Sequence, residues 1–311
     1  MPYYFFPPTK IATRQIEELF DFIWPTAAAL WNLRWQVNGF LQEIPEATPL
    51  QLNDRFVWGS DIHGANLRRA CVETSWDDQK HNLAGVILTN AFAIYERWAD
   101  EILTCVGEPA DSGKALQYSD TAIKGGLQAA IKKACLKESR TIKTAFYPSY
   151  VASRKYSWPI ISNLLACYRF FKEIRNDQIH RGGVAGKRAG AAYLEFAPVS
   201  TKAALGMNGA LIHDPISEGD KIRLHLRGVV GFCDVLFRMI VTIDAELCRS
   251  IHAEAVLEDA LRSSKHPAML SGNPQRRQMQ VVNSCKSAGL PRPLDVEAVR
   301  QFLLAKRIVA L

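Results

Sequence analysis

The chain has 311 residues, of which 48% are hydrophobic and 22% charged, so it can bury a globular core and is not a disordered polypeptide. Its 38 basic and 31 acidic side chains leave a net charge of +7, which is compatible with a polyanionic partner without requiring one. Seven scattered cysteines without a CxxC pair give no sign of a disulfide framework or a zinc site, and we expect no metal or other cofactor.

Helical periodicity dominates the first hundred residues. A long helical region is predicted from Thr13 to Gln42, with a bend near Pro25. The stretch EIPEATPLQLND interrupts this region, and a short helix is expected after Asp61. From Trp76 to Leu103 the apolar residues recur at intervals of three and four, which predicts an amphipathic helix.

The later part of the chain mixes helices with two expected strands. Helices are predicted over Thr121–Thr144, after Pro159 and over Gly228–Leu247. Past Gly182 the segments AAYLEFAPV and KIRLHL have the pattern of short strands, with a turn signal, MNGA, between them. A linker, SSKHPAMLSGNP, precedes two small helices within Gln275–Leu311.

These elements predict an all-α fold, a helical bundle with a small β-hairpin insertion at about residues 191–226 and extra N- and C-terminal helices. We divide the chain into an N-terminal helical region (1–74), the bundle (75–255), and a linker with a C-terminal helical appendage (256–311). The most apolar late stretch, Val229–Ile243, contains Asp234 and Arg238, so it is expected in a core and not in a membrane. The first ten residues do not have the pattern of a signal peptide, and we expect a cytoplasmic protein.

One segment carries a charge excess equal to that of the whole chain. Between Lys124 and Lys155 there are eight basic residues and one acidic residue, 8 − 1 = +7, with aromatic residues towards its end. Cations could follow a phosphate backbone while aromatic rings stack on bases. Alternatively, the segment is a solvated helix followed by a loop whose aromatic rings pack on the core. Candidate RNA-binding residues are Lys132, Lys133, Lys137, Arg140, Lys143, Arg154 and Lys155, together with Arg181 further along.

The helix after Pro159 contains an arginine where periodicity asks for an apolar residue. At about 100° per residue, Arg175 falls in the middle of the apolar stripe that includes Leu164, Tyr168 and Phe171. Burying a guanidinium without a partner costs several kcal/mol. Arg175 must therefore meet a carboxylate, a second chain or an anionic ligand.

The end of the same helix carries further polar residues. Asn176 and His180 are four residues apart and share one face, whereas Arg175 and His180 lie about 140° apart around the helix. Asp177 is expected to be exposed. Two glycines directly after Arg181 favour a helix end there. The histidines elsewhere in the chain share no metal-like spacing, and we expect each to be ordinary: His63, His81, His213, His225, His252 and His266.

These residues resemble a signature of the HEPN superfamily. RNDQIH fits its pattern of an arginine, a polar residue, three further residues and a histidine, and LTNAFAIYERWADEIL is similar to a bundle helix that often carries a glutamate beside aromatic residues. The resemblance covers about Ser75 to His252. It implies a helical bundle that forms a homodimer through the motif helix, with Arg175, Asn176 and His180 as catalytic residues and Glu96 as a supporting contact to Arg175.

The resemblance further implies a metal-independent endoribonuclease that acts as a toxin or antiviral defence effector in abortive infection. Its products would carry 2′,3′-cyclic phosphate and 5′-hydroxyl ends, and its expected partners are RNA and an antitoxin or sensor protein on a separate chain. The alternatives are a non-catalytic helical adaptor that binds nucleic acid or a partner protein, and a latent subunit of a larger defence complex. For Arg175 and His180 a structural ion-pair network at a helix end also stays open.

Overall fold

The chain folds into helices connected by turns and loops. The computed structural model describes residues 3–109 and 111–310, and within these residues it contains no β-strand, which confirms the predicted all-α fold. In chain order the helices are α1 (Pro7–Glu43), α2 (Pro49–Phe56), the π-helix η1 (Arg69–Glu73), α3 (Trp76–Cys105), the 3-10 helix η2 (Ser112–Gln117), α4 (Leu127–Ala134), α5 (Arg140–Ala145), α6 (Tyr147–Val151), the 3-10 helix η3 (Trp158–Ile160), α7 (Ile161–His180), α8 (Lys187–Phe196), the 3-10 helix η4 (Ala197–Val199), α9 (Lys202–Leu205), α10 (Leu226–Leu247), α11 (Ala253–Arg262), α12 (Pro274–Ser287) and α13 (Val296–Ala305).

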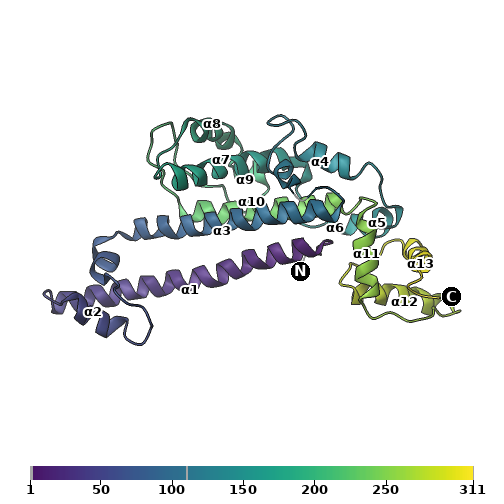
Figure 1. The fold of residues 1–311 in the computed structure, drawn as a ribbon, viewed down its shortest axis with the longest axis horizontal. Coiled ribbons are helices and arrows are strands. Elements are labelled where there is room, and N and C mark those ends of the chain that lie inside the picture. The colour runs from purple at the N-terminus through teal and green to yellow at the C-terminus, as the bar shows by residue number, and fades with distance from the viewer. Residues whose placement is uncertain (1–2, 110, 311) are drawn as a thin grey trace.

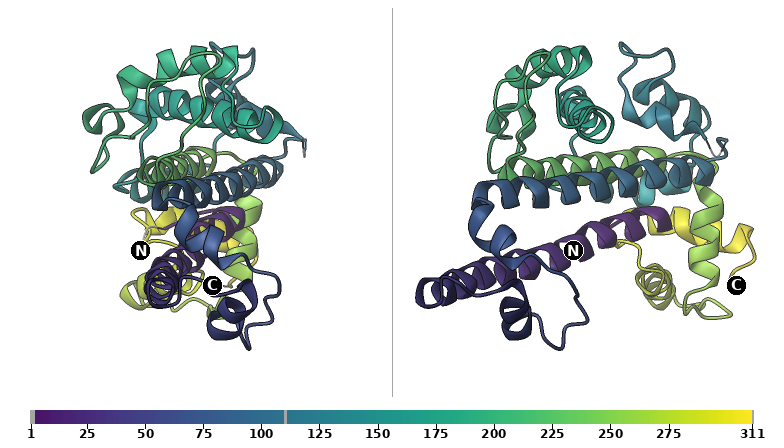
Figure 2. Two further views of the ribbon diagram at one scale, coloured as in Figure 1. Left: turned by 90° about the vertical axis from the view of Figure 1, so that its left-hand side faces the viewer. Right: turned by 60° about the vertical axis from the view of Figure 1, so that its left-hand side comes forward.

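The helices form three layers. The long helices α3 and α10 lie side by side in the middle layer, and α1 packs along both of them on one side (Figures 1 and 2). On the other side, α7 packs against α8, α10 and α3. The helices α11–α13 lie at the end of the molecule away from α2 (Figure 1). Helix α7 is therefore supported by the middle layer, on the side of the bundle opposite to α1.

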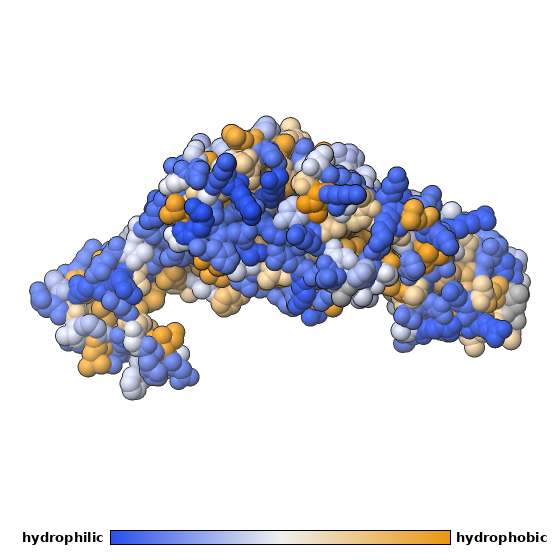
Figure 3. All heavy atoms as spheres, turned by 45° about the horizontal axis from the view of Figure 1, so that its top comes forward, coloured by the Kyte–Doolittle hydropathy of each residue, from blue (hydrophilic) through white to orange (hydrophobic). Residues whose placement is uncertain are grey.

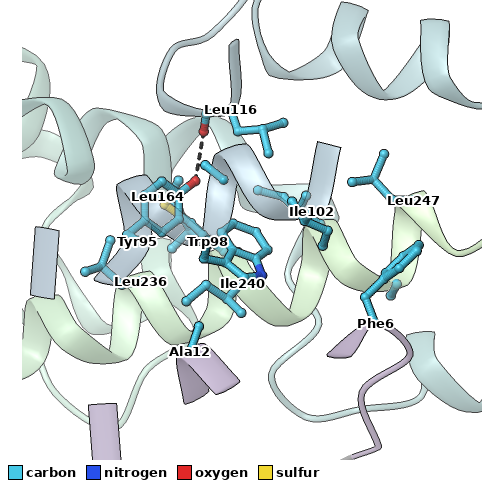
Figure 4. Close-up of a cluster of buried hydrophobic side chains, with 14 of the residues drawn as sticks. Phe6, Ala12, Tyr95, Trp98, Ile102, Leu116, Leu164, Leu236, Ile240 and Leu247 are labelled. Atoms are coloured by element: carbon cyan, nitrogen blue, oxygen red, sulfur yellow. Dashed lines mark hydrogen bonds between the residues drawn. The ribbon is translucent and has the colours of Figure 1, made fainter. Parts of the chain in front are cut away.

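The main core lies between these layers, and two large aromatic residues of α3 have hydrogen-bond partners within it. Figure 4 shows Tyr95 and Trp98 of α3 beside side chains of α10 and α1. The Tyr95 hydroxyl donates a hydrogen bond to the Leu116 carbonyl at 2.8 Å, and the Trp98 indole N–H donates to the Thr9 hydroxyl at 3.0 Å. A buried polar group without such a partner would cost about 1–3 kcal/mol. The large aromatic residues of α3 therefore fit a core that also fixes the start of α1.

A second, smaller core lies at the other end of α1. It consists of Val37, Leu41, Ala47, Leu52, Val57, Leu67 and Cys71. We call this end of the molecule, residues 37–73, the arm; it contains the end of α1 together with α2 and η1. The arm projects beyond the bundle in Figure 1. The division of the chain at residues 74 and 255 stays a prediction, and the main core contains residues on both sides of position 255.

The predicted β-hairpin at 191–226 is wrong. Its first expected strand is helical, because Ala189, Ala192 and Phe196 are buried at intervals of three and four and form the inner face of α8. The second, KIRLHL, runs as an irregular extended segment, and the only β-pairing there is an isolated bridge between Val184 and Lys221. Alternation of apolar and polar residues over so short a segment does not distinguish a strand from a short amphipathic helix.

The predicted helix at 121–144 is also wrong as a continuous element. The chain forms turns up to Gly126, then α4, and then α5, which Ser139 caps by accepting a hydrogen bond from the Ile142 N–H at 3.2 Å. Gly125 has a φ of +79°, a left-handed conformation that ends helical propagation. The two glycines at 125–126 account for the non-helical start of this segment, and a second break at residues 135–139 separates α4 from α5. Across residues 3–109 and 111–310, no helix combines the length and the apolar character that a membrane crossing requires.

Candidate functional site

Helix α7 presents the motif at its C-terminal end. Leu164, Tyr168, Phe171 and Ile174 are buried, and the Tyr168 ring packs 5.2 Å from that of Phe92 on α3, between ring centroids. The helix ends at His180, and the glycines at 182 and 183 both have positive φ angles, +60° and +79°. Because L-residues rarely adopt this conformation, the glycine pair fixes where α7 ends. This confirms the predicted helix end.

Arg175 points towards α3 and meets an internal carboxylate. Its Nη2 donates a hydrogen bond to Oε1 of Glu96 at 3.0 Å, and its guanidinium carbon lies 5.0 Å from the centre of the Phe92 ring. The Arg175 side chain is 18% exposed and that of Glu96 is 33% exposed. The geometry thus agrees with the predicted contact between Glu96 and Arg175. Glu96 is a carboxylate that neutralises the inward-facing guanidinium.

Two cations share this single carboxylate. Lys172 Nζ lies 3.2 Å from the same Glu96 oxygen and also donates a hydrogen bond to Gln117 of η2. The cluster of Lys172, Arg175 and Glu96 therefore carries a formal charge of about +1. The Nε of Arg175 is buried and has no hydrogen-bond partner among the described residues. We call these three residues the motif cluster.

Asn176 and His180 lie outside this cluster. Asn176 is half-buried, and His180, at the last turn of α7, is exposed. Arg175 contacts α3, whereas the His180 side chain faces away from the core. A single chain therefore does not bring Arg175 and His180 together in one pocket, as the five-residue separation indicates.

Asp177 is buried, so the expectation of an exposed side chain was wrong. Its carboxylate accepts a hydrogen bond from the Gly186 N–H at 2.6 Å, and Nε of Arg181 lies 3.7 Å away. The chain turns back after the two glycines and places Gly186 over the carboxylate. Asp177 therefore fixes the loop that follows the motif, and Arg181 is partly neutralised by it.

The predicted RNA-binding residues fall into two groups. Lys133, Lys143 and Lys155 are paired with Glu108, Glu138 and Asp234, respectively. The other four of the basic segment are exposed and have no ion-pair partner in the described part of the chain: Lys132, Lys137, Arg140 and Arg154. Lys132 is on α4 and Arg140 on α5, and these helices pack mainly on η2, α10, α6 and α13, whereas Lys137 and Arg154 lie outside the helices.

The aromatic residues of the basic segment, residues 124–155, and of the residues directly after it pack inside the fold. Phe146 and Tyr150 are buried, and the hydroxyls of Tyr147 and Tyr156 both donate hydrogen bonds to Glu246 of α10, at 2.8 and 2.6 Å. Burial raises the pKa of Tyr147 and of Tyr156, and the bonds to the carboxylate add to this effect. The interpretation in which these rings pack on the core is therefore confirmed, and they are not a stacking surface for bases.

A polar pocket that the sequence did not indicate lies between the starts of α3 and α10. This cavity has a volume of about 550 Å³, and His81, Arg223, His225 and Arg227 are among its lining residues. His81 Nδ1 accepts a hydrogen bond from the Leu224 N–H at 2.9 Å, and burial together with Arg223 lowers its pKa. His225 Nε2 lies 2.9 Å from an Asp214 oxygen, although not in line for a hydrogen bond. Residues far apart in sequence form this pocket, so no local motif could reveal it.

Neither a disulfide nor a metal centre occurs at these sites. The seven cysteines are free thiols, and most of them are buried. Among the residues that the structure describes, no group of three or more His, Cys, Asp or Glu side chains is placed to hold a metal ion.

Comparisons of this chain with protein-family models, with curated proteins and with solved structures found no match. The resemblance to the HEPN superfamily thus rests on the motif and on the helix that carries Glu96.

Proposed function

We propose that this chain is a metal-independent endoribonuclease of the HEPN type, acting as a toxin or antiviral defence effector. The observation that supports this most is the motif cluster. One carboxylate fixes a guanidinium whose side chain is 18% exposed, and Lys172 keeps the cluster cationic. A guanidinium held in this way is suited to stabilising negative charge on a phosphate.

The reaction needs no external nucleophile, because RNA supplies its own 2′-hydroxyl beside the scissile phosphate. His180 takes the 2′-hydroxyl proton or delivers a proton to the departing 5′-oxygen, a role worth about 10²–10⁴-fold. The 2′-oxygen forms a bond to phosphorus and the bond to the 5′-oxygen breaks. The products carry 2′,3′-cyclic phosphate and 5′-hydroxyl ends, and DNA, which lacks the nucleophile, is not cleaved.

The separation of Arg175 from His180 within one chain makes a composite site part of this proposal. A homodimer through the motif helix would place His180 of one protomer near Arg175 of the other, and two histidines would provide an acid and a base. Asn176 would position the phosphate or orient the imidazole. Glu96 would hold Arg175 in place, and a separate antitoxin or sensor chain would control the activity.

A second candidate function is favoured by the same ion pair. Glu96 already neutralises Arg175. The same geometry would therefore result if the pair served only to hold α3 and α7 together. On that interpretation the chain is a non-catalytic helical adaptor for nucleic acid or a partner protein. A latent subunit of a larger defence complex would differ by cleaving RNA only when its partner is present.

The deciding experiment incubates the purified chain with end-labelled RNA in EDTA and analyses the end groups. The ribonuclease gives 2′,3′-cyclic phosphate ends, leaves DNA of the same sequence intact, and loses activity on substitution Arg175→Ala. His63→Ala is a matched control, because His63 is an exposed histidine of the arm. An adaptor retards RNA in a gel without cutting it, and that result would replace the first candidate by the second.

A further inference from the structure

The middle of α1 is apolar but not buried. From Phe22 to Leu33 the sequence FIWPTAAALWNL contains no charged residue. Between Ile23, which belongs to the main core, and Val37, which belongs to the core of the arm, no residue of α1 is buried. A helix segment that is apolar on all sides and without charges is normally covered by other protein. This segment bridges two cores, and between Ile23 and Val37 only Leu33 packs against either of them.

Its aromatic residues form one stripe. At about 100° per residue, Phe20, Trp24, Ala27, Trp31 and Trp35 fall within about 80° of one another. We call these five residues the α1 stripe. Phe20 stacks on Trp24 with ring centroids 5.6 Å apart, and Trp31 packs edge-on against Trp35 at 5.7 Å. Trp31 also packs against Trp76 of α3, with ring centroids 4.9 Å apart, and Phe20 packs against the main core. The stripe is thus two partly covered aromatic pairs with Ala27 between them.

The spacing along the stripe is symmetric. The intervals between Phe20, Trp24, Trp31 and Trp35 are four, seven and four residues, so their centre lies between Ala27 and Ala28. A twofold axis at that point would run the helices of two copies antiparallel and place each aromatic pair against the other pair. Phe20 would then face Trp35 of the partner subunit, and Trp24 would face Trp31 of the partner subunit. Alanines at the centre would let the two helices approach closely, and such self-complementarity is what a twofold interface requires.

The exposed area is of the right order for the centre of such an interface. Trp24, Trp31 and Trp35 are 45%, 39% and 62% exposed. At roughly 200–250 Å² for each indole side chain, they leave roughly 300–370 Å² uncovered per chain. A stable interface buries about 800 Å² per partner, and buried tryptophans at its centre supply much of the binding free energy. Figure 3 shows hydrophobic residues on the surface of the arm as well, where Leu50 and Ile62 are exposed.

The charge of the N-terminal region favours a protein over a polyanion as the binding partner of the α1 stripe. Residues 1–74 contain 6 basic and 8 acidic side chains, a net charge of −2, whereas the rest of the chain has 32 and 23, a net charge of +9. Tryptophans that bind nucleic acid or an anionic membrane are normally accompanied by cations. We therefore infer that the α1 stripe is a homodimer interface, in which α1 packs antiparallel against α1 of a second copy across a twofold axis near Ala27. This interface lies on the opposite side of the bundle from α7 and is independent of the proposed nuclease activity.

The first test measures the mass of the full chain in solution, by light scattering or sedimentation, at about 10 µM. We expect the Trp24→Glu/Trp31→Glu variant to form a smaller assembly than the native chain, because pairing through α1 weakens by at least about 100-fold. The variant is a monomer if α1 is the sole interface, and a dimer if the α7 helices also pair. Phe22→Glu is the matched control, because Phe22 is 65% exposed on the same helix but lies outside the stripe, and this variant keeps the native mass. A native chain that is monomeric at 100 µM, or a double variant with the native mass, would overturn the inference.

A second test fixes the register without weakening the interface. With a short thiol cross-linker, Ala27→Cys should link two chains efficiently, since the axis passes beside it. Gly39→Cys should not, because the two copies of this exposed position would lie roughly 35 Å apart along antiparallel helices. Efficient linkage at position 39 and none at 27 would rule out the antiparallel pairing. If the Trp24→Glu/Trp31→Glu variant instead lost binding to RNA or to anionic vesicles while its mass stayed unchanged, the occupant we infer would be wrong.

Discussion

Two carboxylates of the bundle have contrasting surroundings, Asp244 on α10 and Glu96 on α3. Asp244 is 1% exposed and accepts hydrogen bonds from the N–H groups of Phe5 and Phe6, at 2.8 and 3.1 Å, at the start of α1. Burial raises its pKa to about 6. Glu96 is one third exposed and lies between two cations near the surface.

This difference in burial and in neighbours indicates a structural role for Asp244 and a role in a functional site for Glu96. Asp244 is buried, and its hydrogen-bond partners Phe5, Phe6 and Thr9 all lie at the start of α1, so its contribution is to hold α1 on the middle layer. Glu96 holds two cations whose side chains are still 17% and 18% exposed to solvent. If this comparison is right, changes at the motif cluster affect activity more than stability, and changes at Asp244 do the reverse.

The largest expected effect is on cleavage by the Arg175→Ala variant. Removing a group that stabilises charge on the reacting phosphate should lower the rate of RNA cleavage by about 10²–10³-fold. The free energy of unfolding should change by only about 1 kcal/mol, since Glu96 keeps Lys172 as a partner. Single-turnover cleavage and urea denaturation measure the two effects. A large loss of stability with little loss of rate would assign Arg175 to the fold alone.

The Asp244→Ala variant should show the opposite pattern. Two backbone N–H groups near the start of α1 lose their acceptor in a buried position, which should cost about 2–4 kcal/mol of unfolding free energy. The cleavage rate per folded molecule should remain that of the native chain. Equal stability of the two proteins in urea would show that Asp244 does not hold α1.

The pH dependence of stability sharpens the description of Asp244. Its pKa of about 6 in the folded chain lies above the ordinary value of 3.8, so the folded state holds this proton more tightly than the unfolded state. The contribution of this group to the free energy of unfolding should therefore fall, by about 2–3 kcal/mol, as pH rises from about 4 to about 6, and stay constant above that. Denaturation of the native chain and of Asp244→Asn at pH 4.5 and 7 isolates the effect. Identical pH profiles would contradict it.

The smallest effect is expected for Glu96→Gln. A pair that is partly exposed contributes little, so the unfolding free energy should change by less than about 1 kcal/mol. Cleavage should fall by about tenfold if Glu96 only positions Arg175, since the amide oxygen still accepts a hydrogen bond. Heat denaturation and the cleavage assay can be run on the same sample. A loss as complete as that of Arg175→Ala would give Glu96 a larger role than positioning.

The sequence predicted the fold class and the motif helix well because both depend on local pattern. The three-and-four spacing of Leu88, Phe92 and Tyr95 defines α3, and the glycines at 182–183 define the end of α7. The expected contact of Glu96 with Arg175 is present because an arginine in an apolar stripe needs an anion on the facing helix. These features depend on the local sequence and on one contact between two helices.

The rest depended on contacts that a linear pattern does not contain. Asp177 is buried only because the chain folds back and brings Gly186 onto it. Tyr147 and Tyr156 point inward because Glu246, some ninety residues later, accepts their hydrogen bonds. The pocket of His81 and His225 likewise exists only once α3 and α10 lie side by side. The expected strand AAYLEFAPV, residues 191–199, is instead helical up to Phe196, because so short a segment does not define a period.

The most direct test of the proposed function is RNA cleavage in EDTA by the native chain and by His180→Ala, with both products analysed for their ends. We expect the native chain to release fragments with 2′,3′-cyclic phosphate and 5′-hydroxyl ends, and the variant, folded to the same degree, to be at least about 100-fold slower. Undiminished cleavage by His180→Ala, or fragments that carry 5′-phosphate ends, would contradict it.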